Sequence, residues 1–444
     1  MKIFNSYTNK LEEFVPRHKG KVSIYVCGPT VYSYIHIGNA RPVIFFDTVR
    51  RYFEHRDYEV KFASNFTDVD DKIITKAIEV EKTEKEITDK FIEAFLTDVE
   101  KVNSKTDYIK PRVTEYMDKI ILYIQELINK GYAYQADGDV YFRVTKIKDY
   151  GILSNRNVDD LISGARIEVN TKKENPLDFT LWKKTDVGIK FAAPFGEGRP
   201  GWHTECVAMI ENIFGEEIDI HGGGSGLLFP HHENEIAQAK ALHNHSIAKY
   251  WMHNGLLNIG NAKMSKSEGK TILVKDLTVN PNAFRLFTLS THYRSPINYT
   301  DEVLNNYVKE WDKIVRVYKA LHLKLDLNDH IYGNAKIHPD LLLIYKEFLE
   351  AMDNDFNTAN GITALQKLVK IANQMLRSNT ELDVLLSVLK LFNDFFSVFG
   401  LKPDVIELER EDKKTYLLWE KARKDKDFSA ADKYRNILQE KGVI

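Results

Sequence analysis

Apolar residues change their spacing close to the N-terminus of the chain. β-Branched and aromatic residues dominate Lys21–Val26, which predicts a strand there. Between residues 43 and 53 the apolar side chains fall three or four positions apart, which is the spacing of one face of a helix. Because Pro42 suits the first turn of a helix, we expect this helix to begin near Gly38 and Asn39.

The next strand is expected at residues 59–62. A helix between two strands is typical of a βαβ unit, so the strands should be parallel, with a ligand crevice at their carboxyl ends. Strands at 217–221 and 249–257, with helices at 205–214 and 230–241, are expected to continue this sheet.

The remaining segments have other patterns. Residues 72–103 and 113–130 are expected to be helical, Asp137-Gly138 predicts a hairpin over 132–144, and residues 146–200 are rich in turn residues. Helical periodicity continues from about 300 to 400 and predicts a bundle.

We therefore expect an α/β fold with four parts. A Rossmann-type parallel-sheet domain spans 1–110 and 201–300, an insertion at 111–200 splits it, a helical bundle spans 301–405, and a small region spans 406–444.

Composition narrows the class of protein. Hydrophobic content of 43% and charged content of 28% are those of an ordinary soluble protein. No apolar run approaches the roughly 20 residues of a membrane span, and the N-terminus lacks the apolar core of a signal peptide, so we expect a cytoplasmic protein without membrane contact. With a net charge of −2, nucleic-acid binding would have to rest on local patches.

The only two cysteines suggest a metal site. In a reducing cytosol they are expected to be buried thiols or metal ligands. His231 and Glu235 are one helical turn apart, and with Cys27 and Cys206 they make a tetrahedral set for Zn²⁺. His232 and Glu235, three residues apart, are also geometrically possible as a pair of ligands. The alternative is a capping histidine, solvent-facing glutamates and two inert thiols; the expected position of these residues around one crevice favours the metal.

Two further features suit a nucleotide. His36 precedes an expected helix N-terminus, where unpaired N–H groups attract phosphate, although a packing turn would look similar. Lys263 and Lys266 lie between Gly260 and Gly269, which predicts a flap that closes on a triphosphate. A solvated charged loop is the alternative.

Together these motifs resemble those of class I aminoacyl-tRNA synthetases, and specifically the cysteinyl-tRNA synthetase family. Residues 36–39 (HIGN) resemble the HIGH motif, and residues 263–267 are the KMSKS motif. The other matching motifs are CGPT (27–30), NFTDVDDK (65–72), GWHTEC (201–206), HGGG (221–224), FPHHENE (229–235), HYRSP (292–296) and DFNT (355–358).

The resemblance implies activation of L-cysteine by ATP, with Mg²⁺, to cysteinyl-adenylate, followed by transfer to the 3′ end of tRNA(Cys) by a monomeric enzyme. It implies one Zn²⁺ per chain, held by Cys27, Cys206, His231 and Glu235. The implied ATP contacts are His36, Gly38, Asn39, Lys263 and Lys266, all but Gly38 being catalytic. The implied cysteine contacts are Gly28, Thr30, Thr67 and Trp202.

The chain departs from the family pattern in three places. Gly226 replaces an Asp that could hold the substrate ammonium, and residues 268–270 differ from the usual continuation of the lysine loop. The chain is expected to lack the usual C-terminal extension, so residues 406–444 are predicted to form a shortened anticodon-binding region. Residues 413–444 carry nine Lys or Arg against five Asp or Glu.

Two other functions were considered. A ligase that joins cysteine to an amino-sugar would share the catalytic half, but would not need the region beyond residue 300. A non-catalytic, zinc-bearing tRNA-binding relative is disfavoured because each catalytic position that can be matched is filled.

Overall fold

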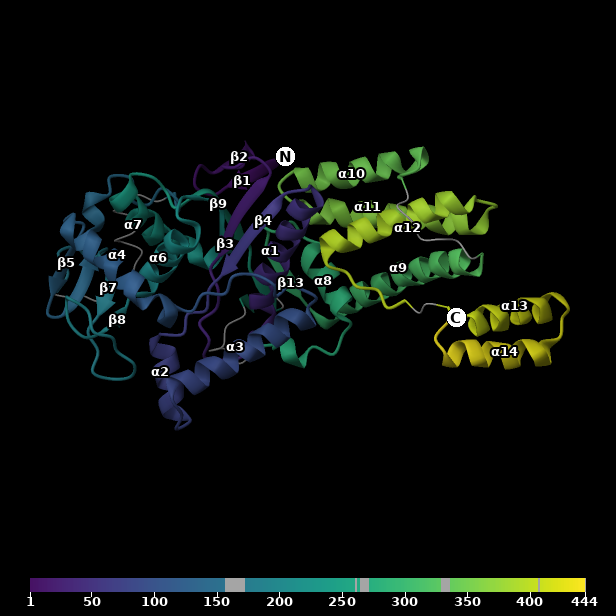
Figure 1. Ribbon diagram of the computed structural model, residues 1–444, viewed down its shortest axis with the longest axis horizontal. Helices are drawn as coiled ribbons and strands as arrows, with labels where there is room; N and C mark the ends of the chain where they lie inside the picture. The colour runs from purple at the N-terminus through teal and green to yellow at the C-terminus, as the bar shows by residue number, and fades with distance from the viewer. Residues whose placement is uncertain (156–171, 260–261, 264–270, 329–335, 406–407, 444) are drawn as a thin grey trace. The chain divides into compact units, whose positions relative to one another are not determined.

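The computed structural model describes the chain except residues 156–171, 260–261, 264–270, 329–335, 406–407 and 444 (Figure 1). The chain forms two compact units. The first contains residues 1–278, 291–300 and 353–356, and the second contains residues 279–290, 301–352 and 357–444.

A parallel four-stranded sheet is the centre of the first unit. Its strands, in spatial order, are β10 (Ala248–Asn254), β9 (Ile218–Gly224), β3 (Lys21–Val26) and β4 (Glu59–Ser64). The predicted parallel sheet is thus confirmed. β3, β9 and β10 are mostly buried, as expected for parallel strands covered on both faces.

Helix α1 (Ile37–His55) connects β3 to β4 and confirms the predicted βαβ unit. It begins earlier than we expected, because His36 and Asn39 form a capping box that fixes the first turn at Ile37. Pro42 therefore lies in the second turn, where the helix lacks one backbone hydrogen bond, and the prediction of Pro42 in the first turn was wrong.

Further described helices of this unit lie before and after the segment that holds α4 (Met117–Asn129). They are α2 (Asp71–Glu79), α3 (Glu84–Lys101), α6 (Trp202–Phe214) and α7 (Glu233–His243). The segment 72–103 is two helices rather than one, because Thr83 caps a new helix start with Glu86 in a second capping box.

The segment between α3 and α6 holds helix α4 and a second sheet. α4 (Met117–Asn129) precedes an antiparallel sheet of β5 (Ala133–Ala136), β6 (Asp139–Phe142), β7 (Phe179–Lys183) and β8 (Arg199–Pro200). The hairpin at Asp137-Gly138 is confirmed, but β7 and β8 lie in the segment expected to be loop. Buried residues of both sheets and of α4 form one core, which contains Tyr25 and Trp251 of the parallel sheet, Trp182 of the antiparallel sheet and Ile124 of α4.

Smaller elements complete the first unit. β1 (Lys2–Asn5) and β2 (Lys10–Glu13) form a hairpin, and β11 (Leu257–Ile259) pairs with β12 (Ala262–Lys263) and β13 (Ile297–Tyr299). Short helical turns of this unit lie at Val113–Tyr116, Val144–Lys146, Ser225–Leu227, Leu228–His232 and Val274–Asp276, and another, Pro339–Leu341, lies in the second unit.

The second unit is helical, as predicted. It contains α8 (Pro281–Leu289), α9 (Asp301–Leu327), α10 (Leu342–Asp353), α11 (Thr358–Arg377), α12 (Leu382–Phe399), α13 (Arg410–Lys424) and α14 (Phe428–Glu440). Helices α9, α11 and α12 pack side by side, and α13 and α14 form a hairpin (Figure 1). Among the described residues, no helix has the length and apolar character needed to cross a membrane.

Candidate active site

One cavity of about 430 Å³ lies at the carboxyl ends of the parallel strands. The predicted site residues that line it are Cys27, Gly28, Thr30, His36, Gly38, Asn39 and Trp202. The structure therefore brings residues predicted for cysteine together with residues predicted for ATP. Lys263 is placed as the last residue of β12, without a described side chain, and Lys266 lies outside the described residues.

His36 and Asn39 hold the N-terminus of α1 at this cavity. His36 Nδ1 accepts a hydrogen bond from the Asn39 backbone N–H at 3.2 Å, and Asn39 Oδ1 accepts one from the His36 backbone N–H at 3.2 Å. Gly38 is required beside them, because a Cβ there would come within 2.9 Å of the His36 ring. A helix N-terminus closed in this way can face the phosphates of a nucleotide.

A cluster of metal-type donors lies behind the cavity wall. Cys27 follows β3, Cys206 belongs to α6, and His231 and Glu235 come from the turn before α7 and from α7 itself. Cys27 Sγ lies 3.6 Å from both Cys206 Sγ and Glu235 Oε1. His231 Nε2 lies 3.8 Å from Cys206 Sγ and 3.0 Å from Glu235 Oε1. The four residues expected as zinc ligands are thus mutually adjacent.

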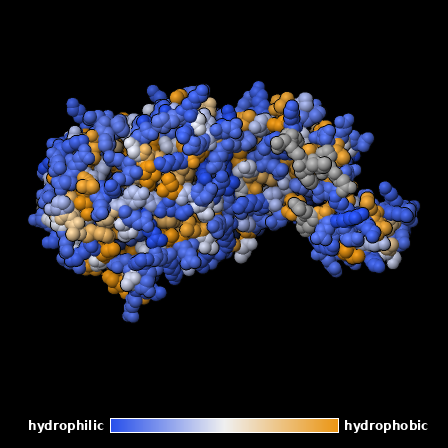
Figure 2. Space-filling view, viewed as in Figure 1, coloured by the Kyte–Doolittle hydropathy of each residue, from blue (hydrophilic) through white to orange (hydrophobic). Residues whose placement is uncertain are grey.

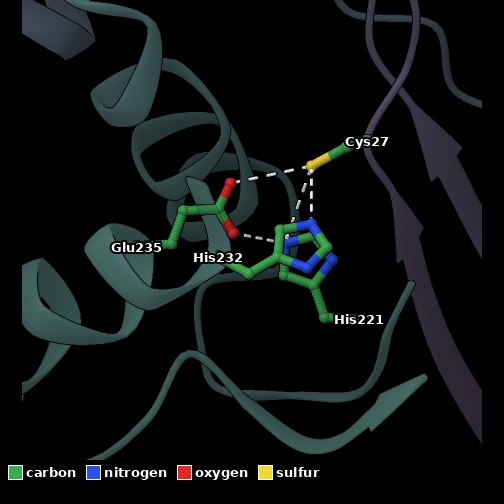
Figure 3. Close-up of side chains that lie close together, drawn as sticks. All are labelled: Cys27, His221, His232 and Glu235. Atoms are coloured by element: carbon green, nitrogen blue, oxygen red, sulfur yellow. Dashed lines mark hydrogen bonds and ion pairs between the residues drawn. The ribbon is translucent and has the colours of Figure 1, made fainter. Parts of the chain in front are cut away.

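A second donor set shares two of these residues (Figure 3). Cys27 and Glu235 also face His221 and His232: Cys27 Sγ is 4.0 Å from His221 Nε2 and 3.3 Å from His232 Nε2. His221 Nε2 lies only 2.6 Å from Glu235 Oε2, which is the distance of a charge-assisted hydrogen bond.

The two sets can be compared with the geometry of zinc. Zn–S bonds of about 2.3 Å and Zn–N or Zn–O bonds of about 2.0–2.2 Å imply ligand atoms roughly 3.3–3.8 Å apart in a tetrahedron. Of the four distances given for the set with Cys206 and His231, the three that involve a sulfur atom lie in this range. In the other set, the 2.6 Å contact between His221 and Glu235 is too short for two ligands, and it is better suited to a hydrogen bond that orients Glu235.

Burial and charge tune this cluster. Burial raises the pKa of the Cys27 thiol, whereas a hydrogen bond from Cys27 lowers the pKa of Cys206 to about 6. Burial opposes protonation of His231, but Glu235 and Cys206 together outweigh it and raise the pKa of His231 to about 10. Burial alone would raise the pKa of Glu235, but His221 and His231 lower it. The expectation of solvent-facing glutamates in the non-metal alternative is therefore wrong, since Glu235 is fully buried.

Three histidines around the donors, His203, His221 and His253, were not proposed as ligands from the sequence. His221 Nδ1 lies 3.2 Å from the Tyr25 carbonyl oxygen, and His203 Nδ1 lies 3.1 Å from His231 Nδ1. His232 Nδ1 lies 2.8 Å from His253 Nε2. A signal was present in the sequence, because His221 and His253 lie in the predicted strands that end beside Cys27.

Thr67 lies next to the cavity rather than in its wall. Its backbone N–H donates to the Pro29 carbonyl at 3.1 Å, and its hydroxyl donates to Glu205 Oε2 at 3.0 Å. Asn65 Nδ2 donates to the same hydroxyl oxygen at 3.3 Å. Glu205 is buried, which raises its pKa, and among the described residues it forms no ion pair, so its carboxyl stands beside Thr67.

Gly28 and Trp202 line the part of the cavity where the cysteine contacts were predicted. A Cβ at Gly28 would lie 1.7 Å from the Asn65 carbonyl oxygen, so only glycine fits this crossing. Trp202 stacks on the His231 ring with 4.3 Å between ring centroids, yet it is 41% exposed and lines the cavity. An apolar surface thus lies directly beside the donor cluster.

Comparison with known proteins decides the family. The family profile "tRNA synthetases class I (C) catalytic domain" matches residues 13–309, and the profile "DALR domain" matches residues 347–402. A cysteine–tRNA ligase from Acholeplasma laidlawii is 48% identical over 450 residues, which is 100% of both chains. One from Anoxybacillus flavithermus is 48% identical over 100% of this chain and 97% of its own. The chain belongs to the cysteine–tRNA ligase family of class I synthetases.

Solved structures agree with this fold at low sequence identity. A Mycobacterium tuberculosis methionyl-tRNA synthetase with methionyl-adenylate has a TM-score of 0.61 and 14% identity, covering 86% of this chain and 90% of its own. An Agrobacterium radiobacter leucyl-tRNA synthetase, solved in a ternary complex with tRNA, has a TM-score of 0.64 and 12% identity, covering 87% and 85%. The full-length cysteine–tRNA ligase relatives show that the chain is an ATP-dependent ligase, and their tRNA activity disfavours both alternative functions.

Proposed function

We propose that this protein activates L-cysteine with ATP, transfers the cysteinyl group to tRNA(Cys), and selects cysteine through zinc. The observation that carries the proposal is the buried donor set of Cys27, Cys206, His231 and Glu235 beside the cavity that also holds His36 and Asn39. The proposal includes Mg²⁺ with ATP, a monomeric state and a cytoplasmic location.

Zinc held by these four residues would supply a Lewis acid that accepts the substrate thiolate as a further ligand. The residues of the chain do the rest. Trp202 covers the donor cluster on the cavity side, and Gly28 keeps the strand end open for the amino acid. Serine would be rejected, because a hydroxyl is a much poorer zinc ligand than a thiolate and no editing domain is then needed.

The cysteine ammonium needs a partner, since Gly226 has no carboxylate. Glu205 supports the proposal here, because its buried carboxyl hydrogen-bonds the Thr67 hydroxyl. The Thr67 hydroxyl donates its hydrogen to Glu205 and accepts one hydrogen bond from Asn65. Its oxygen therefore still has one lone pair, which could accept a hydrogen bond from the ammonium. The positive charge would in turn lower the pKa of Glu205, which burial raises.

The adenylation step would use the N-terminus of α1. His36 and Asn39 hold that terminus at the cavity, where its N–H groups and partial positive charge suit the triphosphate. Lys263 and Lys266 are proposed to neutralise charge as pyrophosphate leaves.

The anticodon region is proposed to be the α13–α14 hairpin. Arg423 lies over the Trp419 ring at 4.7 Å, and Tyr416 packs against Trp419. Leu417 and Phe428 are exposed, and hydrophobic residues gather among polar ones on this hairpin (Figure 2). Aromatic faces for bases next to basic residues for phosphates are what a single-stranded RNA loop requires.

An exchange assay followed by a charging assay tests the whole proposal. Wild-type protein should catalyse cysteine-dependent exchange of pyrophosphate into ATP and then charge tRNA(Cys), while serine at the same concentration should give no exchange. Metal analysis should find one zinc per chain. Appreciable activation of serine, or full activity without stoichiometric zinc, would contradict the selection by zinc.

A further inference from the structure

Asn254, the last residue of β10, has an unusual hydrogen-bond state. The side chain is 2% exposed, and its Nδ2 donates to the Gly255 carbonyl oxygen at 3.2 Å. Its Oδ1 is buried and accepts no hydrogen bond from any described residue. A buried carbonyl oxygen without a donor is costly, so such an atom in a ligand cavity points to a group that arrives with the ligand.

The hydrogen bonds fix which end of the amide is left over. Gly255 O also accepts a hydrogen bond from Arg41 Nη1 at 2.7 Å. Only the NH₂ end of Asn254 can face that carbonyl, because two oxygens would repel each other. The unsatisfied atom is therefore the oxygen.

Asn254 lines the cavity at a wall without side chains. In the sheet it is paired with Gly224 of β9. Cβ atoms added at Gly224 or Gly226 would meet nothing within 4 Å, so open space lies beside these glycines, and no described side chain donates to Asn254 Oδ1. A ligand group has room to approach at this point.

Strand alternation places Asn254 on the nucleotide side of the sheet. Trp251 and His253 face the donor cluster, with ring centroids 5.3 and 5.0 Å from that of His232. Successive residues of a strand point to opposite faces, so Asn254 points away from this cluster. Asn254 therefore lies on the face of the sheet that α1 covers, and Arg41 of α1 donates to the carbonyl oxygen of the next residue, Gly255.

We propose that Asn254 Oδ1 accepts a hydrogen bond from the adenosine part of ATP. The available donors are the two ribose hydroxyls and the adenine amino group. This contact makes Asn254 a determinant of nucleotide recognition, at a wall where Gly226 contributes no polar side chain. The inference rests on ATP-dependent adenylation, but not on the zinc site or on tRNA.

ATP analogues that each lack one donor test this contact. Pyrophosphate exchange would be measured with ATP, 2′-deoxy-ATP, 3′-deoxy-ATP and purine riboside triphosphate, for wild type, Asn254→Leu, Asn254→Ala and Asn254→Asp. In the wild type, one analogue should lose about tenfold or more in kcat/KM. Asn254→Leu and Asn254→Ala should show this loss already with ATP and little further loss with that analogue, while the KM for cysteine stays within about twofold.

The aspartate variant is the matched control, because it keeps an acceptor oxygen and should still discriminate against the same analogue. Asn254→Ala keeps the test open if the leucine variant does not fold. If every analogue lowers kcat/KM by equal factors in wild type and in the alanine variant, Asn254 does not contact the nucleotide. Absence of exchange in the wild type would instead refute the proposed function itself.

Discussion

At the scale of single residues, the donor cluster combines two thiols, an imidazole and a carboxylate in a site closed to solvent except on the cavity side. Cys206, His231 and Glu235 are almost fully buried, whereas Cys27 is partly exposed and lines the cavity. A metal held by these four groups therefore has its open side toward the substrate, which distinguishes it from a closed structural site.

Zinc affinity should depend steeply on pH. Burial raises the pKa of Cys27, and Glu235 together with Cys206 overcomes burial to raise the pKa of His231 to about 10, so both groups hold protons near neutral pH that zinc must displace. Affinity should therefore fall as pH falls, by roughly 10- to 100-fold per pH unit for one or two released protons. Competition with a chelator between about pH 6 and pH 8 measures it, and a pH-independent affinity would exclude these ligands.

Glu205 and Gly226 give a paired prediction on the cysteine ammonium. Glu205→Gln should raise the KM for cysteine by roughly 10- to 100-fold, the effect of losing a hydrogen-bonded charge, with zinc content unchanged. Gly226→Asp should change that KM by less than about threefold if Glu205 already provides the charge. Steady-state exchange kinetics decide the matter; a large gain in affinity from Gly226→Asp would show that Glu205 does not hold the ammonium.

At the scale of elements, the N-terminus of α1 and the lysine loop form the proposed phosphate site. Lys266→Ala should lower the adenylation rate by roughly 10²- to 10³-fold, the scale for removing one donor to the transition state. Cysteine binding should be nearly unchanged, because the lysine acts on the triphosphate. Rapid-quench adenylation and equilibrium binding of cysteine separate the two effects, and a collapse of cysteine affinity would contradict the role of the loop.

Elements with strong local signals could be predicted from the sequence. Lys21–Val26 was predicted to the residue, and the hairpin at Asp137-Gly138 was found because that dipeptide fits a tight turn. The start of α1 was predicted closely, near Gly38 and Asn39 against Ile37, but the position of Pro42 in the first turn was wrong, because His36 and Asn39 cap the helix one turn earlier. β8 was missed because two residues, Arg199 and Pro200, form a strand only by pairing with β7.

The candidate site was predictable as a set of residues but not as a geometry. Cys27, Cys206, His231 and Glu235 could be assembled from residue type, spacing and family resemblance. The supporting contacts could not, because His221 on Glu235 and Glu205 on Thr67 join segments that are far apart in the sequence. Such contacts depend on how the sheet and helices pack, which no local pattern contains.

At the scale of the whole molecule, the described residues of the proposed zinc and cysteine sites belong to the first unit and the α13–α14 hairpin to the second. Deleting everything after about residue 405 should leave pyrophosphate exchange nearly intact, while the tRNA concentration needed for charging should rise strongly because the proposed anticodon contacts are lost. Both assays on one truncated protein measure this. Unchanged charging kinetics would place anticodon reading elsewhere.

A milder change tests the same surface without deleting a helix. Trp419→Ala removes a proposed stacking partner, and Leu418→Ala, on the neighbouring exposed position, is its control. The KM for tRNA should rise roughly 10- to 100-fold for Trp419→Ala, the loss expected for one stacked base, and little for the control. Equal effects of both variants would indicate a folding defect rather than lost stacking.

The central claim is that the substrate thiolate binds the metal held by Cys27, Cys206, His231 and Glu235. The most direct measurement replaces zinc by Co²⁺ and records the thiolate-to-cobalt charge-transfer absorption during titration with cysteine. The account predicts that the absorption rises and saturates at one cysteine per cobalt, and that serine leaves it unchanged. A spectrum that cysteine does not alter, in protein that still activates cysteine, would contradict the account.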